Sequence, residues 1–231
     1  MNGPNSPIGW TDFTWNPVTG CLNNCSYCYA RKLANGRLSK YYLKQQNFID
    51  SLNYPFAPRL WPQRLLEPYK LKKPAKIFVC DMGELFGYWV PSKWIEKVLK
   101  VARDNPRHTF QFLTKVPLRL KEFQFSDNCW CGTTITIDSE WPRIALLLEA
   151  DCVLRFVSFE PLHGLISAPL RSVDWIIIGA ETGNRKGKVV PQEEWIAHII
   201  DQADYWRVPV FMKDNLKPYW HDPLRREFPS Q

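Results

Sequence analysis

Three cysteines lie within eight residues of one another near the start of the chain, at Cys21, Cys25 and Cys28. Three residues separate the first pair and two separate the second, so one short loop can wrap a single metal centre. Iron–sulfur cubanes and closed zinc sites usually take four ligands, and no fourth ligand follows at a comparable spacing. Three protein ligands leave one metal position open for a substrate or cofactor. The spacing therefore predicts metal or redox chemistry that can be catalytic, with a three-cysteine zinc site as the alternative.

The elements that would position this loop follow from the hydrophobic pattern. From about residue 75 onward, short β-branched or aromatic runs alternate with stretches of helical periodicity, which is typical of a parallel sheet covered on both faces. Six strands are expected at 75–80, 108–114, 130–136, 152–159, 174–180 and 208–212, with a seventh within 14–20. Helices are expected within 91–106, 139–150 and 191–206, with a shorter one at 117–123.

The number and order of these elements predict an α/β fold, a partial (β/α) barrel of about six to seven parallel strands. A complete eight-stranded barrel takes roughly 250 residues. This chain has 231, of which 31–74 are basic, aromatic and broken by prolines and are expected to form an irregular insertion. We expect a single domain over 1–231 with a C-terminal tail at 214–231. A flat, doubly wound sheet is the structural alternative.

Composition and charge narrow the class of protein. Hydrophobic residues at 45% and charged residues at 23% are ordinary for a globular protein and exclude disorder, collagen-like repeats and long coiled coils. No window approaches the ~20 apolar residues of a membrane span, and no secretory pattern opens the sequence, so a cytoplasmic protein without a membrane partner is expected. Thirty Lys and Arg against 23 Asp and Glu give a net charge of +7. That charge favours a polyanionic partner, or it serves solubility alone.

An aromatic residue directly before the third cysteine adds a resemblance to a known family. The pattern Cys21-Leu-Asn-Asn-Cys25-Ser-Tyr27-Cys28 resembles the signature of radical S-adenosylmethionine (radical SAM) enzymes. The resemblance implies that the three cysteines bind three irons of a [4Fe-4S] cluster, that SAM chelates the fourth iron, and that Tyr27 lies near the adenine. It also implies an electron donor, because the reduced cluster would cleave SAM to a 5′-deoxyadenosyl radical.

Further segments are similar to one group within that superfamily, the phage Gp37/Gp68 group of radical-SAM-like proteins. They occur in order along most of the chain: GWTDFTWNPVTGC before the cysteines, FVCDMGELF (78–86), FLTKVPLRL (112–120), RFVSFEPLHG (155–164), DWIIIGAETG (174–183) and VPVFMKD (208–214). If the protein is phage-encoded, the resemblance implies that it works in the host cytoplasm.

Polar residues follow the ends of the predicted strands, where ligands bind in (β/α) barrels. A Gly-Gly-Glu-like element of the superfamily receives the SAM amine, and Gly83 and Glu84 match its second and third residues, with Met82 in place of the first glycine. The late-strand GxIxGxxE element is only approximated, with Gly179 at its second glycine and Glu181 one residue early. The residues expected at SAM are Tyr27, Gly83, Glu84, Thr114, Thr134, Ser158, Glu160 and Gly179. The catalytic candidates are Glu160, Glu181, His163 and Lys213.

Four further cysteines lie outside the triad, at Cys80, Cys129, Cys131 and Cys152. Cys129 and Cys131 are two apart and would share one face of a strand, which raises the question of a second cluster. Free cysteine is among the residue types most often buried, so we favour core packing for all four.

The substrate is not fixed by the cofactor motif. Basic and aromatic residues in 31–74 and 214–231 suit phosphate contacts and base stacking. Together with the phage resemblance they favour an enzyme that rearranges, as an isomerase, or otherwise modifies a hypermodified thymine-type base in phage DNA. The alternatives are tRNA modification, repair of a DNA lesion, action on a peptide, and a non-catalytic nucleic-acid-binding protein with a zinc site. DNA is favoured over tRNA, and the oligomeric state, the atom attacked and the fate of SAM stay open.

Overall fold

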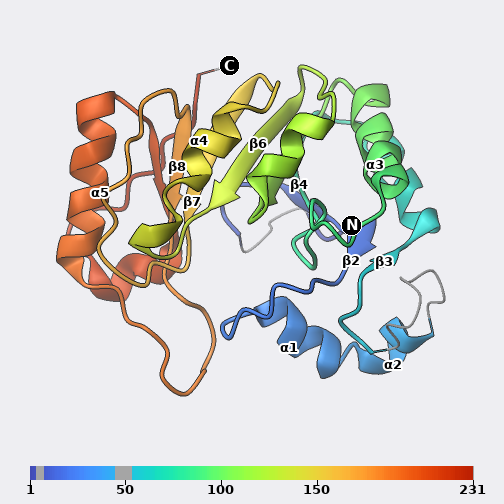
Figure 1. Cartoon of the computed structure of the whole chain (residues 1–231), viewed down its shortest axis with the longest axis horizontal. Coiled ribbons are helices and arrows are strands. Elements are labelled where there is room, and N and C mark those ends of the chain that lie inside the picture. The colour runs from blue at the N-terminus through green and yellow to red at the C-terminus, as the bar shows by residue number, and fades with distance from the viewer. Residues whose placement is uncertain (4–7, 45–53, 231) are drawn as a thin grey trace.

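Seven parallel strands form the main sheet of the computed structural model, which describes residues 1–3, 8–44 and 54–230. Their order across the sheet is β1 (Phe13–Trp15), β4 (Lys76–Val79), β5 (Thr109–Thr114), β6 (Cys129–Thr134), β7 (Leu154–Phe159), β8 (Trp175–Ile178) and β9 (Val210–Met212). Strand order follows chain order without the reversal that defines a doubly wound sheet. The sheet curls into a half-barrel (Figure 1), which confirms the expected fold and all seven expected strands.

Helices cover the outer face of the half-barrel (Figure 1). They are α3 (Ser92–Asp104), α4 (Arg143–Leu148) and α5 (Glu193–Trp206). Apolar residues at helical spacing, such as Ile95 on α3 and Ile199 on α5, pack in one core with alternate residues of the strands, such as Ile77 and Val157. The remaining strand residues face the inside of the half-barrel because successive side chains alternate between the two faces.

The inside of the half-barrel is filled at one end by aromatic rings. Trp10, Trp130, Phe156, Trp175 and Phe211 form a second buried cluster, with ring centroids about 6 Å apart in mostly tilted or edge-to-face pairs. These rings close the amino-terminal end of the barrel and leave its other end, where the strands finish, to polar side chains.

Segments around the cysteine loop form a smaller layer at one side of the sheet. It contains β2 (Val18–Thr19) paired antiparallel with β3 (Arg59–Leu60), the helices α1 (Tyr29–Asn35) and α2 (Ser39–Leu43), and two 3-10 turns, η1 (Pro62–Leu66) and η2 (Pro68–Lys70). The expected irregular insertion at 31–74 is therefore more regular than the sequence indicated, although 45–53 lie outside the described residues.

Two expected helices differ from the structure at prolines. The helix expected at 139–150 is a 3-10 turn, η4 (Asp138–Glu140), followed by α4, which begins only after Pro142. The segment at 117–123 is a 3-10 helix, η3 (Pro117–Glu122), with its proline in the first turn. Proline has no N–H to donate and restricts the residue before it, so each helix starts after the proline or stays short.

The C-terminal tail is anchored to the edge of the sheet. A 3-10 helix, η5 (Asp214–Tyr219), follows β9, and the chain then returns so that Met212 N–H donates to Arg225 O and Glu227 N–H donates to Val210 O. In the described part of the chain, no helix is both long and apolar enough to cross a membrane.

The inner packing predicts a cost for adding one methyl group at Gly132. A Cβ there would lie 2.6 Å from the ring of Phe156, which is fully buried and cannot swing aside. We expect Gly132→Ala to lower the free energy of unfolding by about 1–3 kcal/mol, measured by urea denaturation. Gly164→Ala is the matched control, since a Cβ there meets nothing within 4 Å. Equal stabilities of the two variants would contradict this packing.

Candidate functional site

One cavity of about 670 Å³ lies where the strands end, between the half-barrel and the cysteine loop. Its size is typical of small-molecule sites. Most residues expected from the sequence line it: Cys21, Cys25, Tyr27, Cys28, Gly83, Glu84, Thr114, Thr134, Ser158, Glu160, Glu181 and Lys213. Gly179 and His163 do not line the cavity. The Glu160 side chain covers Gly179, and His163 packs against the Tyr27 ring.

The cysteine loop is fixed to the end of β4 by a close backbone approach between Gly20 and Gly83. Gly20 N–H donates to Met82 O at 2.9 Å, and Glu84 N–H donates back to Gly20 O at 3.1 Å. A Cβ on Gly83 would lie 3.0 Å from the backbone of Gly20, and Gly20 itself has a φ of +92°. Gly20 therefore requires glycine and a Cβ at Gly83 would be crowded, and the contact between the two places Cys21 at the mouth of the half-barrel.

The three thiols of the loop face the same cavity and are free. Backbone N–H groups donate to two of the sulfur atoms, from Asn23 to Cys21 Sγ and from Arg31 to Cys28 Sγ, each at 3.3 Å. Burial raises the pKa of the Cys21 thiol to about 12 and also raises the pKa of Cys28. Such thiols ionise only beside a positive centre, which is what a metal supplies.

Three thiols can bind either one metal ion or a cluster. Within the described ranges, no three Cys, His, Asp or Glu side chains are placed to hold a single metal ion together. A zinc ion with Zn–S bonds of about 2.3 Å requires its thiolates roughly 3.8 Å apart. A cubane binds its thiolates through different irons, so its ligands stand further apart. Three free thiols around one cavity supply the thiolate donors that an iron–sulfur cluster takes.

Tyr27 is held between two strand-end residues. Lys115 Nζ donates to the Tyr27 hydroxyl at 2.7 Å, and the ring of His163 meets the Tyr27 ring edge-on with centroids 5.0 Å apart. Burial lowers the pKa of the Lys115 ammonium and raises the pKa of Tyr27. Tyr27 is therefore held between Lys115, which follows β5, and His163, which lies in the segment after β7.

Glu84 is a buried carboxylate at the centre of the strand ends. Thr114 Oγ1 and Phe86 N–H donate to its Oε1 at 2.7 and 3.1 Å, and Lys115 N–H donates to its Oε2 at 2.9 Å. Burial raises its pKa, and these donors oppose the rise. Three donors leave one of about four lone-pair positions for a further donor, such as an ammonium group.

Glu160 and Lys213 form an ion pair across the cavity. Lys213 Nζ lies 2.5 Å from Glu160 Oε1, and both side chains are half-buried. Glu160 lies over Gly179, where a Cβ would come within 2.8 Å of its carboxyl carbon. Gly179 therefore acts on the cavity indirectly, by leaving room for Glu160.

Glu181 and His163 belong to a network that the sequence did not reveal. Glu181 is 2% exposed, its Oε1 accepts from Arg185 Nε at 2.7 Å, and its Oε2 accepts from a second Arg185 nitrogen at 2.8 Å. His163 Nε2 lies 3.2 Å from the same Oε2. Hydrogen bonds from Arg185 lower the pKa of Glu181, and burial lowers the pKa of His163. Glu181 and Arg185 are four residues apart, a spacing that brings two side chains together on a helix. This segment is a loop, so the spacing did not predict the pair.

A second polar network lines the cavity at Asp81. Asn16 Nδ2 donates to Asp81 Oδ1 at 2.6 Å, and the Tyr29 hydroxyl donates to Asp81 O at 2.7 Å. Burial raises the pKa of Asp81, while these donors lower it. Its partners lie 65 and 52 residues away in sequence, so no local pattern indicated this site.

The other four cysteines lie in the hydrophobic core. Cys129 and Cys131 are 0% exposed and share the outer face of β6, as expected, and the Cys152 thiol donates to Leu154 O at 3.4 Å. Cys80 is also buried. Their surroundings agree with core packing.

Comparisons with known proteins give a family and a fold. Residues 5–222 match the family model described as "Protein of unknown function (DUF5131)", and none of the curated proteins compared matches the chain. The fold is similar to that of spore photoproduct lyase. A Cys-to-Ala variant with dinucleoside spore photoproduct aligns with a TM-score of 0.56 at 10% identity, over 91% of this chain and 77% of that one. A Cys-to-Ser variant aligns with a TM-score of 0.55 at 10% identity, over 96% and 79%. At 10% identity, this structural similarity shows a shared fold and nothing further.

The bonds of Glu84 predict the effect of removing one donor. Thr114→Val takes away the shortest hydrogen bond to a buried carboxylate, and we expect it to lower the free energy of unfolding by about 1.5–3 kcal/mol. Thr109→Val, at the other end of β5, is the control and should change stability by less than about 0.5 kcal/mol. Urea denaturation measures both, and a neutral Thr114→Val would show that the bond is unimportant.

Proposed function

The chain belongs to the DUF5131 family, and we propose that it is a radical SAM enzyme that acts on a base of DNA. One observation carries the proposal: the three thiols of the Cys21–Cys28 loop line one cavity with the polar ends of the strands of a half-barrel. The likeness of the fold to spore photoproduct lyase with a bound dinucleoside supports the choice of nucleic acid as substrate.

Cys21, Cys25 and Cys28 are the residues that would hold a [4Fe-4S] cluster in this chain. When bound, the cluster supplies an electron that cleaves SAM to methionine and a 5′-deoxyadenosyl radical. The protein contributes the position of the loop, fixed through Gly20 and Gly83, and the N–H donors to the Cys21 and Cys28 sulfurs. Such donors tune the potential of a cluster.

The SAM molecule would lie along the polar strand ends. Lys115 and His163 hold Tyr27 rigid, so that its ring can contact the adenine. Gly83 leaves room at the backbone, and Glu84 has one acceptor position left for the SAM ammonium. Thr134 and Ser158, paired in register on neighbouring strands, offer hydroxyls to the ribose or to the methionyl end.

Glu160 and Lys213 are our candidates for groups that face the reactants. The pair presents opposite charges to the cavity, so Glu160 can receive an ammonium while Lys213 binds a carboxylate. Glu181 and His163 are engaged with Arg185 and Tyr27, and we assign them a positioning role instead.

The base would enter between SAM and the apolar wall of the cavity. Ile8, Trp10, Phe78 and Leu113 line that wall, and the rings of Trp10 and Phe78 are the ones on which a base can stack. A base in a duplex would first have to be flipped out of the helix. Within this class we propose rearrangement or another modification of a hypermodified thymine-type base in phage DNA. Repair of a base lesion is the second candidate, because the fold resembles that of a lyase bound to a dinucleoside.

Removal of single thiols tests the cluster. We expect the anaerobically reconstituted protein to hold about four irons and four sulfides per chain, and Cys21→Ala, Cys25→Ala or Cys28→Ala to lose most of them. Cys152→Ala is the control and should retain the full amount, since Cys152 lies in the core. Production of 5′-deoxyadenosine from SAM should follow the iron content. One tightly held zinc without iron would contradict the proposal and favour a zinc-containing binding protein.

Nucleoside mass spectrometry tests the substrate. With SAM and a reductant, we expect the enzyme to change a base in DNA carrying hypermodified thymines or in ultraviolet-damaged DNA, and to leave tRNA unchanged. The Cys28→Ala variant supplies the inactive control. A changed base in tRNA alone would overturn the assignment to DNA.

A further inference from the structure

Two segments beside the cavity carry basic residues and no acidic ones. Residues 21–44 hold Arg31, Lys32, Arg37, Lys40 and Lys44 and contain no Asp or Glu. The loop at 182–190, with the sequence TGNRKGKVV, holds three more cations and again no acid. Of the cations in these two segments, all but Arg31, Arg185 and Lys188 belong to exposed residues.

Seven of these eight cations have no acidic partner among the residues that the structure describes, Arg185 being the exception. Elsewhere cations are often paired: Arg225 with Asp204 and Glu227, and Lys217 with Asp214. Without these seven, the sequence would hold equal numbers of basic and acidic residues, since its net charge is +7. The two segments together therefore hold eight of the 30 basic residues of the chain and none of its 23 acidic residues.

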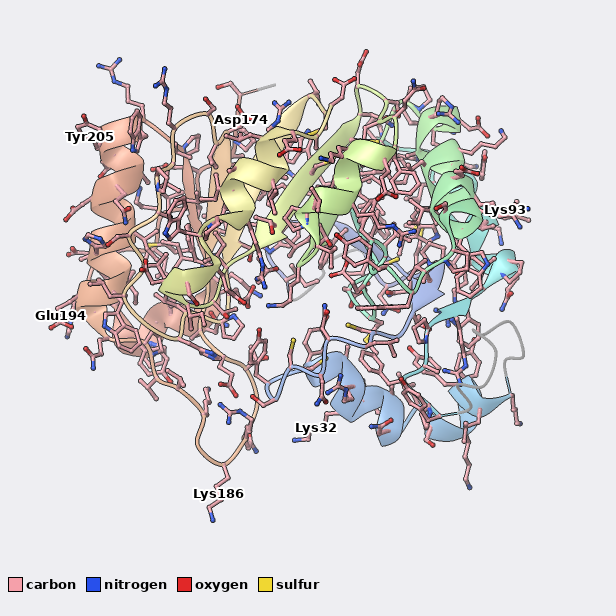
Figure 2. All side chains as sticks on the ribbon, viewed as in Figure 1. Lys32, Lys93, Asp174, Lys186, Glu194 and Tyr205 are labelled. Atoms are coloured by element: carbon pink, nitrogen blue, oxygen red, sulfur yellow. The ribbon has the colours of Figure 1, made fainter. Side chains whose placement is uncertain are left out.

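Both segments border the mouth of the cavity from opposite sides. Tyr29 and Ala30, at the start of α1, line the cavity on the side of the cysteine loop, and Glu181 and Thr182, at the base of the 182–190 loop, line it on the other. Figure 2 shows Lys32 on α1 and Lys186 near the tip of the loop at the same edge of the molecule, both pointing away from its body.

The 182–190 loop is anchored at its base. Arg185 forms two hydrogen bonds to the buried carboxylate of Glu181, which also contacts His163. Gly183 and Gly187 have φ angles of +84° and +73°, a conformation that turns the chain on either side of Arg185. The loop therefore carries Lys186 outward (Figure 2), and neither Lys186 nor Lys188 has an acidic partner among the described residues.

We propose that α1, α2 and the 182–190 loop form two sides of a phosphate-binding surface that holds single-stranded DNA across the mouth of the cavity. Lysines that neutralise phosphates release condensed counterions, so such a surface binds a strand independently of its sequence. A strand held on both sides presents the base between them to the aromatic wall of the cavity. This inference rests on the proposed function, because it names how the substrate reaches that site.

Paired charge removals test the surface. The two test variants are Lys186→Gln with Lys188→Gln in the loop, and Lys32→Gln with Lys40→Gln on α1 and α2. The control is Lys93→Gln with Lys97→Gln on α3, two exposed lysines without an ion pair among the described residues, and Figure 2 shows Lys93 far from the loop. The probe is a fluorescein-labelled 12-nucleotide oligodeoxythymidylate, and its binding is followed by fluorescence anisotropy at several salt concentrations.

We expect each test pair to weaken binding on the order of tenfold at about 0.1 M salt and to reduce the slope of log K against log salt by about 1.4. The control pair should match the wild type in both. Unchanged binding in both test pairs, no binding by the wild type, or a loss confined to one side would overturn the two-sided surface.

Iron content and 5′-deoxyadenosine production, measured on the same preparations, separate this inference from the proposed function. If the test pairs keep both and still bind DNA like the wild type, the surface is wrong and the enzyme assignment stands. If the wild type holds no cluster but the test pairs lose DNA binding, the surface stands and the enzyme assignment is wrong.

Discussion

The position of the thiols depends on one contact, the approach of the backbone at Gly20 to the backbone at Gly83. This contact ties the cysteine loop to the turn that follows β4, so that loop and sheet share one cavity. Parallel strands bring all their polar ends to the same edge, and the curl of the sheet gathers that edge around a single space. Without the glycine contact, the loop would be tied to those ends through side chains such as Tyr27 and Tyr29, and no longer through its backbone at Cys21.

Local sequence predicted the parts of the fold that local forces decide. The strands are short apolar runs covered on both faces, and α3 and α5 show helical spacing of apolar residues, so their positions could be read directly. The helix at 139–150 was expected too long because its apolar residues continue on both sides of Pro142, and the proline decides the boundary. The pairing of β2 with β3 could not be predicted, since each strand has only two residues and about 40 residues separate them.

The candidate site also has residues whose proximity the sequence predicted and residues whose proximity it could not predict. The three cysteines and Tyr27 are close in sequence, so their spacing alone indicated a shared centre. Lys115 binds Tyr27 across 88 residues and Asn16 binds Asp81 across 65, and only the folded sheet brings them together. Glu181 was expected as a catalytic candidate, and it lines the cavity with Arg185 and His163 beside its carboxylate. The sequence predicts that an acidic residue lies at the end of a strand, but the groups that surround it in the folded chain decide what it binds.

The account centres on an iron–sulfur cluster with one iron left open for SAM beside Tyr27 and Glu84. The most direct measurement is the EPR spectrum of the anaerobically reconstituted, reduced protein with and without SAM. The account predicts the signal of a reduced four-iron cluster whose g values shift when SAM is added, because SAM binds the open iron. A cluster signal that SAM leaves unchanged, or no cluster signal at all, would contradict it.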